Sequence, residues 1–427
     1  MGRGGDGTER CEPHRARVDR WRTSASVLDE VRRSPGLTRV ELAARLNLSS
    51  ATTTETVARL RESGWLAEER APVSGRGRPT TCLRPAPDGP RVLALDLRHE
   101  DWRLAVAGLD GVPTVRCSGR RGDDLAGQLA RAVSAVTSGA SGTLAAPTDA
   151  SGTLAASTHA NGTLAPVGAA VPDRGRPLAL GLAAPAPLSD DVFVRATELD
   201  WGAVALGGLV AGLGEPAIPV HPGNDATLAG LAEARSGAAA GAGTALSLTV
   251  EVGLGGTLLL DGRPQRGAHG AAGEYGHLPF GDPAVACPCG SWGCWGPELD
   301  GRALARHLGV DAPADPRTFA IEVLDRAAAG DEAAGRAVAR VATVLGRGVA
   351  GLVNAHDPDV VVLGGLAPRL RGPAFDEAYR YGLMAYRRAD PTPVRDAVHG
   401  DDAALYGAVA LALDEVTSAE GLARAAG

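Results

Sequence analysis

The tightest constraint on how this chain folds is a group of four metal-binding residues within 18 positions, namely His277, Cys287, Cys289 and Cys294. Three thiolates and one imidazole are a complete tetrahedral set for zinc, with bonds of about 2.3 Å to sulfur and about 2.0 Å to nitrogen. Gly290 and Gly293 permit the tight backbone turns that so short a loop requires. Because no coordination position stays open, we predict a structural zinc ion rather than a catalytic one. The alternative is a loop with three unpaired cysteines.

Other features of the sequence indicate a cytoplasmic protein. No apolar run approaches the roughly 20 residues of a membrane helix. The first twenty residues carry charges without the apolar core of a secretory signal. We therefore expect no membrane partner, and in a cytosolic chain a tight cysteine cluster favours metal over disulfide. The three remaining cysteines, Cys11, Cys82 and Cys117, are scattered and are predicted to be ordinary thiols.

Charge is distributed unevenly along the chain. The net charge is −7 over 427 residues. Residues 1–90 hold 16 Arg against 12 Asp and Glu, a balance of +4, so the remainder carries −11. All 43 basic residues are Arg, so no Lys is available to contact phosphate. A basic head on an acidic body favours nucleic-acid binding by the head, and a merely solvated surface is the competing interpretation.

Residues 21–88 have the spacing of a winged helix-turn-helix. A first helix with one apolar face is broken by Pro35-Gly36. Thr38 and Glu41 form a capping box at the start of a short second helix, and Asn47-Leu48 makes the turn that follows. This order of a helix, a short helix, a tight turn and a third helix is typical of DNA-binding heads.

The third helix is expected to begin at Ser49 or Ser50 and to be closed by Gly64. Its first turns are rich in short hydroxyl side chains, which suit phosphate and base-edge contacts at the start of a recognition helix. Its inner face is predicted to carry Thr53, Val57 and Leu60.

A wing is predicted after the third helix. Residues 65–68 and 80–83 form two short strands around the loop 75–79, whose glycines allow a close approach to a groove and whose arginines favour a narrow minor groove. We predict contacts to a double-stranded DNA operator from Thr38, Arg39, Ser49, Ser50, Thr52, Thr53, Thr54, Arg76 and Arg78. The competing interpretation is a three-helix scaffold with a flexible basic linker.

The body has an α/β pattern. Apolar strands are expected at residues 91–97, 102–109, 112–117, 178–184, 244–252, 256–260 and 359–363, with helices at 123–136 and 402–416 and a helical run from Asn224-Asp225 through Glu233. A continuous apolar strand such as 359–363 is buried on both faces, and ligands bind at the carboxyl ends of such strands.

A ten-residue unit is repeated about three times, beginning at Ser141, Ser151 and Asn161. Its small residues, few charges and lack of a core-building pattern predict a disordered insertion at 138–172. A solenoid is the alternative, but solenoid repeats usually have about 20 residues or more. Residues 1–20 are likewise predicted to be a disordered tail.

The stretch from Gly267 to Cys294 resembles the signature of the ROK family of repressors and sugar kinases. Asn224-Asp225, the strand and glycines from Val360 to Gly365 and the winged head occur in the family's order. The resemblance therefore covers nearly the whole chain except the repeat and both tails. It implies an α/β fold of two lobes, actin-like and ribonuclease-H-like, behind the winged helix-turn-helix.

The resemblance also implies functional residues. His277, Cys287, Cys289 and Cys294 would bind zinc, and the sugar would be contacted by Asn224, Asp225, Glu274 and His277. Carboxylates, an amide and an imidazole suit vicinal hydroxyls. The domains would be a winged head at 21–88, a first lobe at 89–215 and a second lobe with the zinc site at 216–401. A helix at 402–417 would pack back on the first lobe.

Kinases of the family begin their first phosphate motif with Asp, any residue and Gly, whereas this chain has Asp96-Leu97-Arg98. Arg98 would stand where backbone amides must close around phosphate. Glu251 precedes the second phosphate motif and would oppose an anionic nucleotide. Asp225 matches the kinase general base, but a base without a phosphate cradle does not transfer phosphate efficiently. We therefore expect no enzymatic activity, with Asp225 a vestigial base.

These features favour a DNA-binding transcriptional regulator, a repressor, acting as a homodimer or homotetramer with a small effector between the lobes. Gly296 replaces a sugar-contacting Glu of the family, and Glu298 follows Pro297, which restricts the loop. A sugar, a sugar phosphate, a non-sugar ligand or no ligand therefore stay open. Two other functions also stay open: an ATP-dependent sugar kinase that retains a DNA-binding head, and a ligand-binding module without DNA binding.

Overall fold

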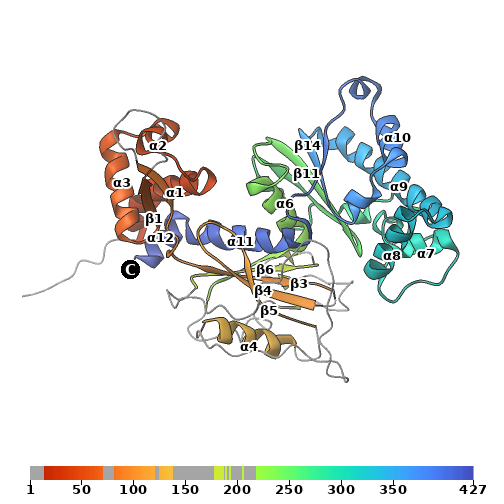
Figure 1. Ribbon diagram of the computed structural model, residues 1–427, viewed down its shortest axis with the longest axis horizontal. Coiled ribbons are helices and arrows are strands. Elements are labelled where there is room, and N and C mark those ends of the chain that lie inside the picture. Colours follow the sequence, from red (N-terminus) through yellow and green to blue (C-terminus); the bar gives the residue numbers. More distant parts are fainter. Residues whose placement is uncertain are drawn as a thin grey trace, which may run out of the picture.

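The computed structural model describes residues 14–70, 81–99, 101–120, 125–137, 177–186, 188–189, 192–193, 204–205 and 218–426. A helical head, a first lobe and a second lobe follow one another along the chain, and α11 runs between them (Figure 1). The ten-residue repeat, the tip of the wing and Cys11 lie outside the described residues.

The head consists of three helices and two strands, namely α1 (His14–Arg33), α2 (Arg39–Leu46), α3 (Ser50–Glu62), β1 (Leu66–Arg70) and β2 (Thr81–Pro85). The two strands pair in antiparallel fashion. The capping box predicted before α2 is confirmed: the Glu41 amide donates to the Thr38 hydroxyl at 3.2 Å, and the Thr38 amide donates to the Glu41 carboxylate at 2.8 Å. Asn47 ends α2 in the left-handed conformation, with φ of 51°, which makes the predicted turn.

Helix α1 begins earlier than expected. The prediction of a disordered tail through residue 20 is wrong for residues 14–20, which are helical. Val18 and Trp21 are each 7% exposed and belong to the core of the head. Of these two residues only Val18 lies in the extra turns, and its burial contributes about 2 kcal/mol to ordering them. The sequence did not reveal this because Val18 is a single apolar residue among charges.

The first lobe is built on a five-stranded sheet in the order β10-β6-β3-β4-β5. Its strands are β3 (Val92–Leu97), β4 (Asp101–Ala107), β5 (Thr114–Arg120), β6 (Leu180–Ala184) and β10 (Val220–Asn224). Alternate residues of β3 face opposite sides: Leu93, Leu95 and Leu97 share a core with α4 (Leu125–Thr137). Val92 and Ala94 share the other core with α11 (Ala403–Val416). A sheet covered on both faces explains the continuous apolar run of β3.

Three two-residue strands form a separate small sheet in the order β7-β8-β9, namely β7 (Leu188–Ser189), β8 (Val192–Phe193) and β9 (Val204–Ala205).

The second lobe repeats the topology of the first. Its sheet has the order β13-β12-β11-β14-β15, with β11 (Thr244–Glu251), β12 (Gly253–Leu260), β13 (Arg263–Pro264), β14 (Val360–Gly365) and β15 (Val394–Asp396). In both lobes three strands form an antiparallel meander, and two more add in parallel beside the first strand. This duplication is the two-lobed actin-like fold.

Helices enclose the second sheet. They are α7 (Gly301–Leu308), α8 (Pro316–Ala328), α9 (Glu332–His356) and α10 (Pro373–Gly382), with short 3-10 turns at η2 (Tyr275–His277), η3 (Gly296–Glu298), η4 (Ala367–Leu370), η5 (Ala385–Arg388) and η6 (Gly400–Asp402). Their apolar faces form one core with β11 and β14. None of these helices had been anticipated from the sequence.

Helices α6 (Asp225–Ser236) and α11 join the two lobes. Helix α6 packs on β11 and β12 of the second lobe, α11 packs on β3 and β6 of the first, and the two helices pack on each other. A last helix, α12 (Ala419–Ala425), turns back and contacts α1 of the head. Within the described residues, no helix combines the length and the apolar character that crossing a membrane would require.

Candidate functional site

The exposed face of α3 carries short polar side chains. Ser49 is the N-cap of α3, and its hydroxyl accepts a hydrogen bond from the Thr52 amide at 3.0 Å. Ser50, Thr52 and Thr54 are exposed on the first two turns. A helix that presents small hydroxyl side chains at its N-terminal end has the shape and chemistry of a DNA recognition helix.

Thr53 and Arg39, which are also predicted to contact DNA, are engaged with other parts of the head. Thr53 is 1% exposed and its hydroxyl donates to the Ser49 carbonyl at 3.0 Å, so this side chain is part of the head core and not of the DNA-facing surface. Arg39 forms an ion pair of 2.6 Å with Glu68 of β1. Arg76 and Arg78 lie outside the described residues.

The four predicted metal ligands converge in the second lobe. The ligand atoms of His277, Cys287, Cys289 and Cys294 all lie within 4.8 Å of one another. The Sγ atoms of Cys289 and Cys294 are 3.8 Å apart, and Cys287 Sγ is 3.7 Å from His277 Nδ1. Tetrahedral zinc with bonds of about 2.0–2.3 Å places its ligand atoms about 3.5–3.8 Å apart, so the donor set fits zinc.

The backbone around the cysteines has the tight turns that the sequence predicted. The Cys287 amide donates to the Ser291 carbonyl at 2.8 Å, and Ala286 and Trp292 form an isolated bridge. Gly290 has φ of 93°, a left-handed conformation that favours glycine. All five described cysteines, including Cys82 and Cys117, are free thiols.

A second group of polar residues lies where α6 begins. Asn224 is the N-cap of α6, and its side-chain oxygen accepts from the Thr227 amide at 3.0 Å. Asp225 is the first residue of the helix. The pKa of Asp225 is raised to about 7, mainly by burial and in smaller part by the carboxylates of Asp96, Glu251 and Glu274, against the opposing effect of the Ala226 amide. Four carboxyl groups from both lobes therefore share one electrostatic environment.

Glu274 and His277 connect these carboxyl groups with the cluster of one histidine and three cysteines. Glu274 Oε2 is 3.7 Å from His277 Nε2, while His277 Nδ1 faces Cys287. Burial raises the pKa of Glu274, and the neighbouring His277 opposes that shift. The imidazole thus lies between the cysteines on one side and a half-buried carboxylate on the other.

An ion-pair network occupies the position of the first phosphate motif. Asp96 is 2% exposed and accepts from both Arg98 and Arg103 at 2.9 Å. Arg98 and Arg103 also donate to the Asp401 carbonyl, at 2.5 and 2.9 Å. The first lobe is thereby tied to the segment that leads into α11.

The second lobe joins the same network. Arg317 of α8 pairs with Glu251 at the end of β11, and its other nitrogen lies 3.1 Å from the Asp401 carboxylate. Arg103 pairs with Asp402 at 2.5 Å. We call the residues Asp96, Arg98, Arg103, Glu251, Arg317, Asp401 and Asp402 the interlobe clasp.

Only part of this clasp is predictable from the sequence. Asp96, Arg98 and Glu251 were singled out, but Arg103, Arg317 and the two aspartates were not. Arg103 lies directly opposite Asp96 in the β3–β4 pair, so a hairpin register would have revealed it. Arg317 and Asp401 come from distant parts of the chain and carry no local signal.

The loop from Gly296 to Glu298, which lacks the family's sugar-contacting Glu, is buried in the second lobe. Gly296 is buried between the backbones of Gly253 and Gly276. Glu298 is 7% exposed and forms an ion pair of 2.9 Å with Arg306 of α7. Glu298 is therefore engaged inside the second lobe.

The fold and these sites define a class of protein: an actin-like body of two lobes behind a winged helix-turn-helix. Comparison with protein families gives the same result, since residues 169–415 match the ROK family and residues 22–77 match the MarR family. The first match spans more than half of the chain, and this chain belongs to the ROK family.

The similar proteins include sugar kinases and a transcriptional regulator. A glucokinase of Halalkalibacterium halodurans is 31% identical over 209 residues, which are 45% of this chain and 63% of that protein, so the chain spans less than two thirds of it. A solved ROK-family transcriptional regulator, described as a homologue of the E. coli MLC protein, shares the fold at a TM-score of 0.70 and 19% identity, over 96% of this chain and 98% of its own. A ROK hexokinase of Thermus thermophilus aligns at a TM-score of 0.54 and 32% identity, over 76% of this chain and 99% of its own.

Proposed function

We propose that this protein is a DNA-binding transcriptional regulator, a repressor whose operator binding is controlled by a sugar or sugar-like ligand between the two lobes. The observation that carries the proposal is the exposed polar face of α3, on a winged head whose core is continuous with the body. The alignment with a solved ROK regulator over 96% of the chain supports it.

Operator binding would use the head of each subunit of a symmetric dimer on a palindromic site. Ser50, Thr52 and Thr54 would face base edges and phosphates in the major groove, and Arg76 and Arg78 would enter the minor groove. Because the chain has no Lys, ion pairs with phosphate would come from Arg alone, and the affinity would fall steeply with salt.

The ligand would bind against Asp225, Glu274 and the Nε2 atom of His277, with Asn224 holding the start of α6. The cluster of His277, Cys287, Cys289 and Cys294 would hold a zinc ion, which supplies a structural cross-link for this loop. His277 would use Nδ1 for the metal, so that its ring fixes the position of Glu274 beside the ligand. The ligand would change operator affinity by no more than the factor by which its own affinity differs between the two arrangements of the lobes.

The interlobe clasp supports a protein without kinase activity. A phosphate group in this position would have to displace guanidinium groups that already bind Asp96 and Glu251. A sugar kinase that retains a DNA-binding head is the second candidate, favoured by the carboxyl group of Asp225, whose pKa of about 7 suits a general base.

The test is fluorescence anisotropy on DNA from upstream of the gene, with and without a panel of sugars. Replacing Thr54 by Glu places a negative charge on the recognition face, and we expect operator affinity to fall at least about tenfold. The matched control, Ala333→Glu at the exposed start of α9, adds the same charge far from the head and should bind normally.

Two results would reject the proposal. Absence of salt-dependent DNA association by the unaltered protein would leave a ligand-binding module. ATP-dependent phosphorylation of a sugar that disappears in Asp225→Asn would establish the kinase.

A further inference from the structure

A cavity of about 530 Å³ lies where the head meets the body. Its walls come from one face of α1, from the end of β10, from α6 and α11, and from the turn before β13 together with β13 and the loop that follows it. Asn224 touches it, but Asp225, Glu274 and His277 do not line it. The volume is within the range of sites for small molecules, so this is a second space for a ligand, apart from the interlobe site.

The helical walls carry paired charges. On α1, Asp29 and Arg33 are four residues apart and form an ion pair of 2.9 Å. Arg235 of α6 pairs with Asp414 of α11 at 2.5 Å. These two pairs are neutral in sum. The Nε atom of Arg235 is nevertheless buried without a hydrogen-bond partner among the described residues, so a donor in the wall is left unsatisfied.

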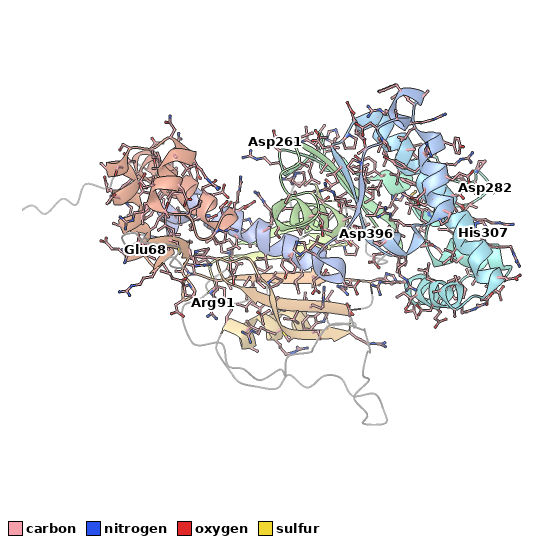
Figure 2. All side chains as sticks on the ribbon, turned by 45° about the horizontal axis from the view of Figure 1, so that its top comes forward. Glu68, Arg91, Asp261, Asp282, His307 and Asp396 are labelled. Carbon is pink, nitrogen blue, oxygen red and sulfur yellow. The ribbon has the colours of Figure 1, made fainter. Side chains whose placement is uncertain are left out.

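The hairpin and the residues after it add two more arginines to the cavity wall. Asp261 and Gly262 have φ of 49° and 71° and make a two-residue turn, which fixes the register of the strands. Asp261 marks the tip of this hairpin, on the side of the second lobe nearest the head (Figure 2). Arg263 and Arg266, just after the turn, line the cavity, and in the described part of the chain neither has a carboxylate partner.

The cavity therefore has an excess of positive charge. It is lined by four arginines and two aspartates, a formal balance of +2. Guanidinium groups bind phosphate oxygens in bidentate fashion and are the preferred side chains for phosphate recognition. We propose that this cavity binds a small phosphate-bearing anion, which bridges Arg33 of the head and the arginines of the β12–β13 hairpin.

Such a ligand would act on the head directly. The cavity walls belong to α1 of the head, to the two helices that join the lobes and to the second lobe. A bound anion stabilises the arrangement in which these parts enclose it, by the free energy of its binding. This site adjoins the sugar site of the proposed function at Asn224 but is lined by none of Asp225, Glu274 and His277.

The test is isothermal titration calorimetry of the full-length protein with glucose 6-phosphate and with inorganic phosphate, in saturating glucose. We expect one molecule of glucose 6-phosphate per chain, with binding retained in Asp225→Asn. Arg263→Ala/Arg266→Ala should weaken binding by about tenfold for each guanidinium lost. Arg263→Lys/Arg266→Lys keeps the charge but loses the bidentate hydrogen bonds. Its affinity should lie between those of the unaltered protein and the alanine variant.

The matched control is Arg336→Ala/Arg340→Ala, two arginines on the exposed side of α9, which should bind like the unaltered protein. If inorganic phosphate binds as tightly as glucose 6-phosphate, the result supports the site and identifies free phosphate as its occupant. The proposal is overturned if neither probe binds at millimolar concentration, if the Arg263→Ala/Arg266→Ala protein binds normally, or if Asp225→Asn abolishes binding.

Discussion

Asp225 illustrates how position changes the chemistry of a residue. It is the first residue of α6, where its Oδ1 accepts the Ala226 amide at 2.7 Å, an interaction that favours the charged carboxylate. Burial dominates and raises the pKa to about 7, with Asp96, Glu251 and Glu274 adding repulsion. At neutral pH this carboxyl group is therefore divided between its neutral and charged forms.

This shift makes a prediction about stability. The folded-state pKa lies above the ordinary value of 3.8, so the contribution of Asp225 to stability is full in acid and is lost as pH rises through about 7. Asp225→Asn removes the titration. We expect its free energy of unfolding, relative to the unaltered protein, to increase by about 3 kcal/mol between pH 5 and pH 8. Urea titrations at the two pH values measure this, and an unchanged difference would show that the carboxyl group is not buried.

At the scale of elements, contact between α6 and α11 decides how the lobes meet. A Cβ atom on Gly407 of α11 would lie 1.9 Å from the Leu228 carbonyl oxygen of α6. The same close approach occurs between α11 and the sheet, where a Cβ on Gly181 of β6 would lie 1.9 Å from the Ala408 carbonyl oxygen. Glycine here allows backbones to touch, so these two positions fix the spacing of the interlobe helices.

Two identical substitutions in helices are expected to act in opposite directions. Gly407→Ala forces α6 away from α11 and should lower stability by about 2 kcal/mol or more. Gly335→Ala, in α9, meets no atom within 4 Å and should raise stability by about 0.5–1 kcal/mol, because alanine loses less backbone entropy. Thermal melts of both proteins provide the measurement. A Gly407→Ala protein as stable as Gly335→Ala would contradict the close packing of the two helices.

For the whole molecule, the main finding is that the head is packed on the body. One hydrophobic core runs from Val57 of α3 through Trp21 of α1 and Leu422 of α12 to Leu405 of α11. Arg32 of α1 adds hydrogen bonds of 3.2 Å to the Leu109 carbonyl and to the Thr417 hydroxyl. The head is thereby attached to α11 by both apolar packing and hydrogen bonds.

Leu422 tests this coupling because it is 1% exposed in the contact with the head. Leu422→Asp buries a charge in that contact and should release the head, since a buried unpaired charge costs several kcal/mol. We expect a larger radius of gyration in X-ray scattering, with operator binding retained and its response to ligand lost. Val310→Asp, at a position 51% exposed after α7 in the second lobe, is the control that should leave both properties unchanged. If the Leu422→Asp protein stays compact and its operator binding responds normally to ligand, α12 does not couple the head to the body.

Local signals carried much of the fold. The capping box at Thr38, the turn at Asn47 and the strand 359–363 were predictable, because each depends on neighbours within a few residues. The N-terminal start of α1 and the helices α7 to α10 were not, because their side chains are ordered by packing against distant elements. Thr53 was predicted both on the inner face of α3 and as a DNA contact. The structure places its side chain on the inner face, where it is buried and does not face DNA.

By itself the sequence determined the candidate metal-binding set, the order of the domains and the family, because spacing along the chain limits which residues can meet in a short loop or helix. Only the tertiary structure decided which charges meet across the chain. Arg317, Asp401 and Arg98 are far apart in sequence, yet they join one clasp, and Arg33 and Arg263 line one cavity. The reason is physical: Coulomb interactions and cavities depend on separation in space, which the fold sets and the sequence does not display.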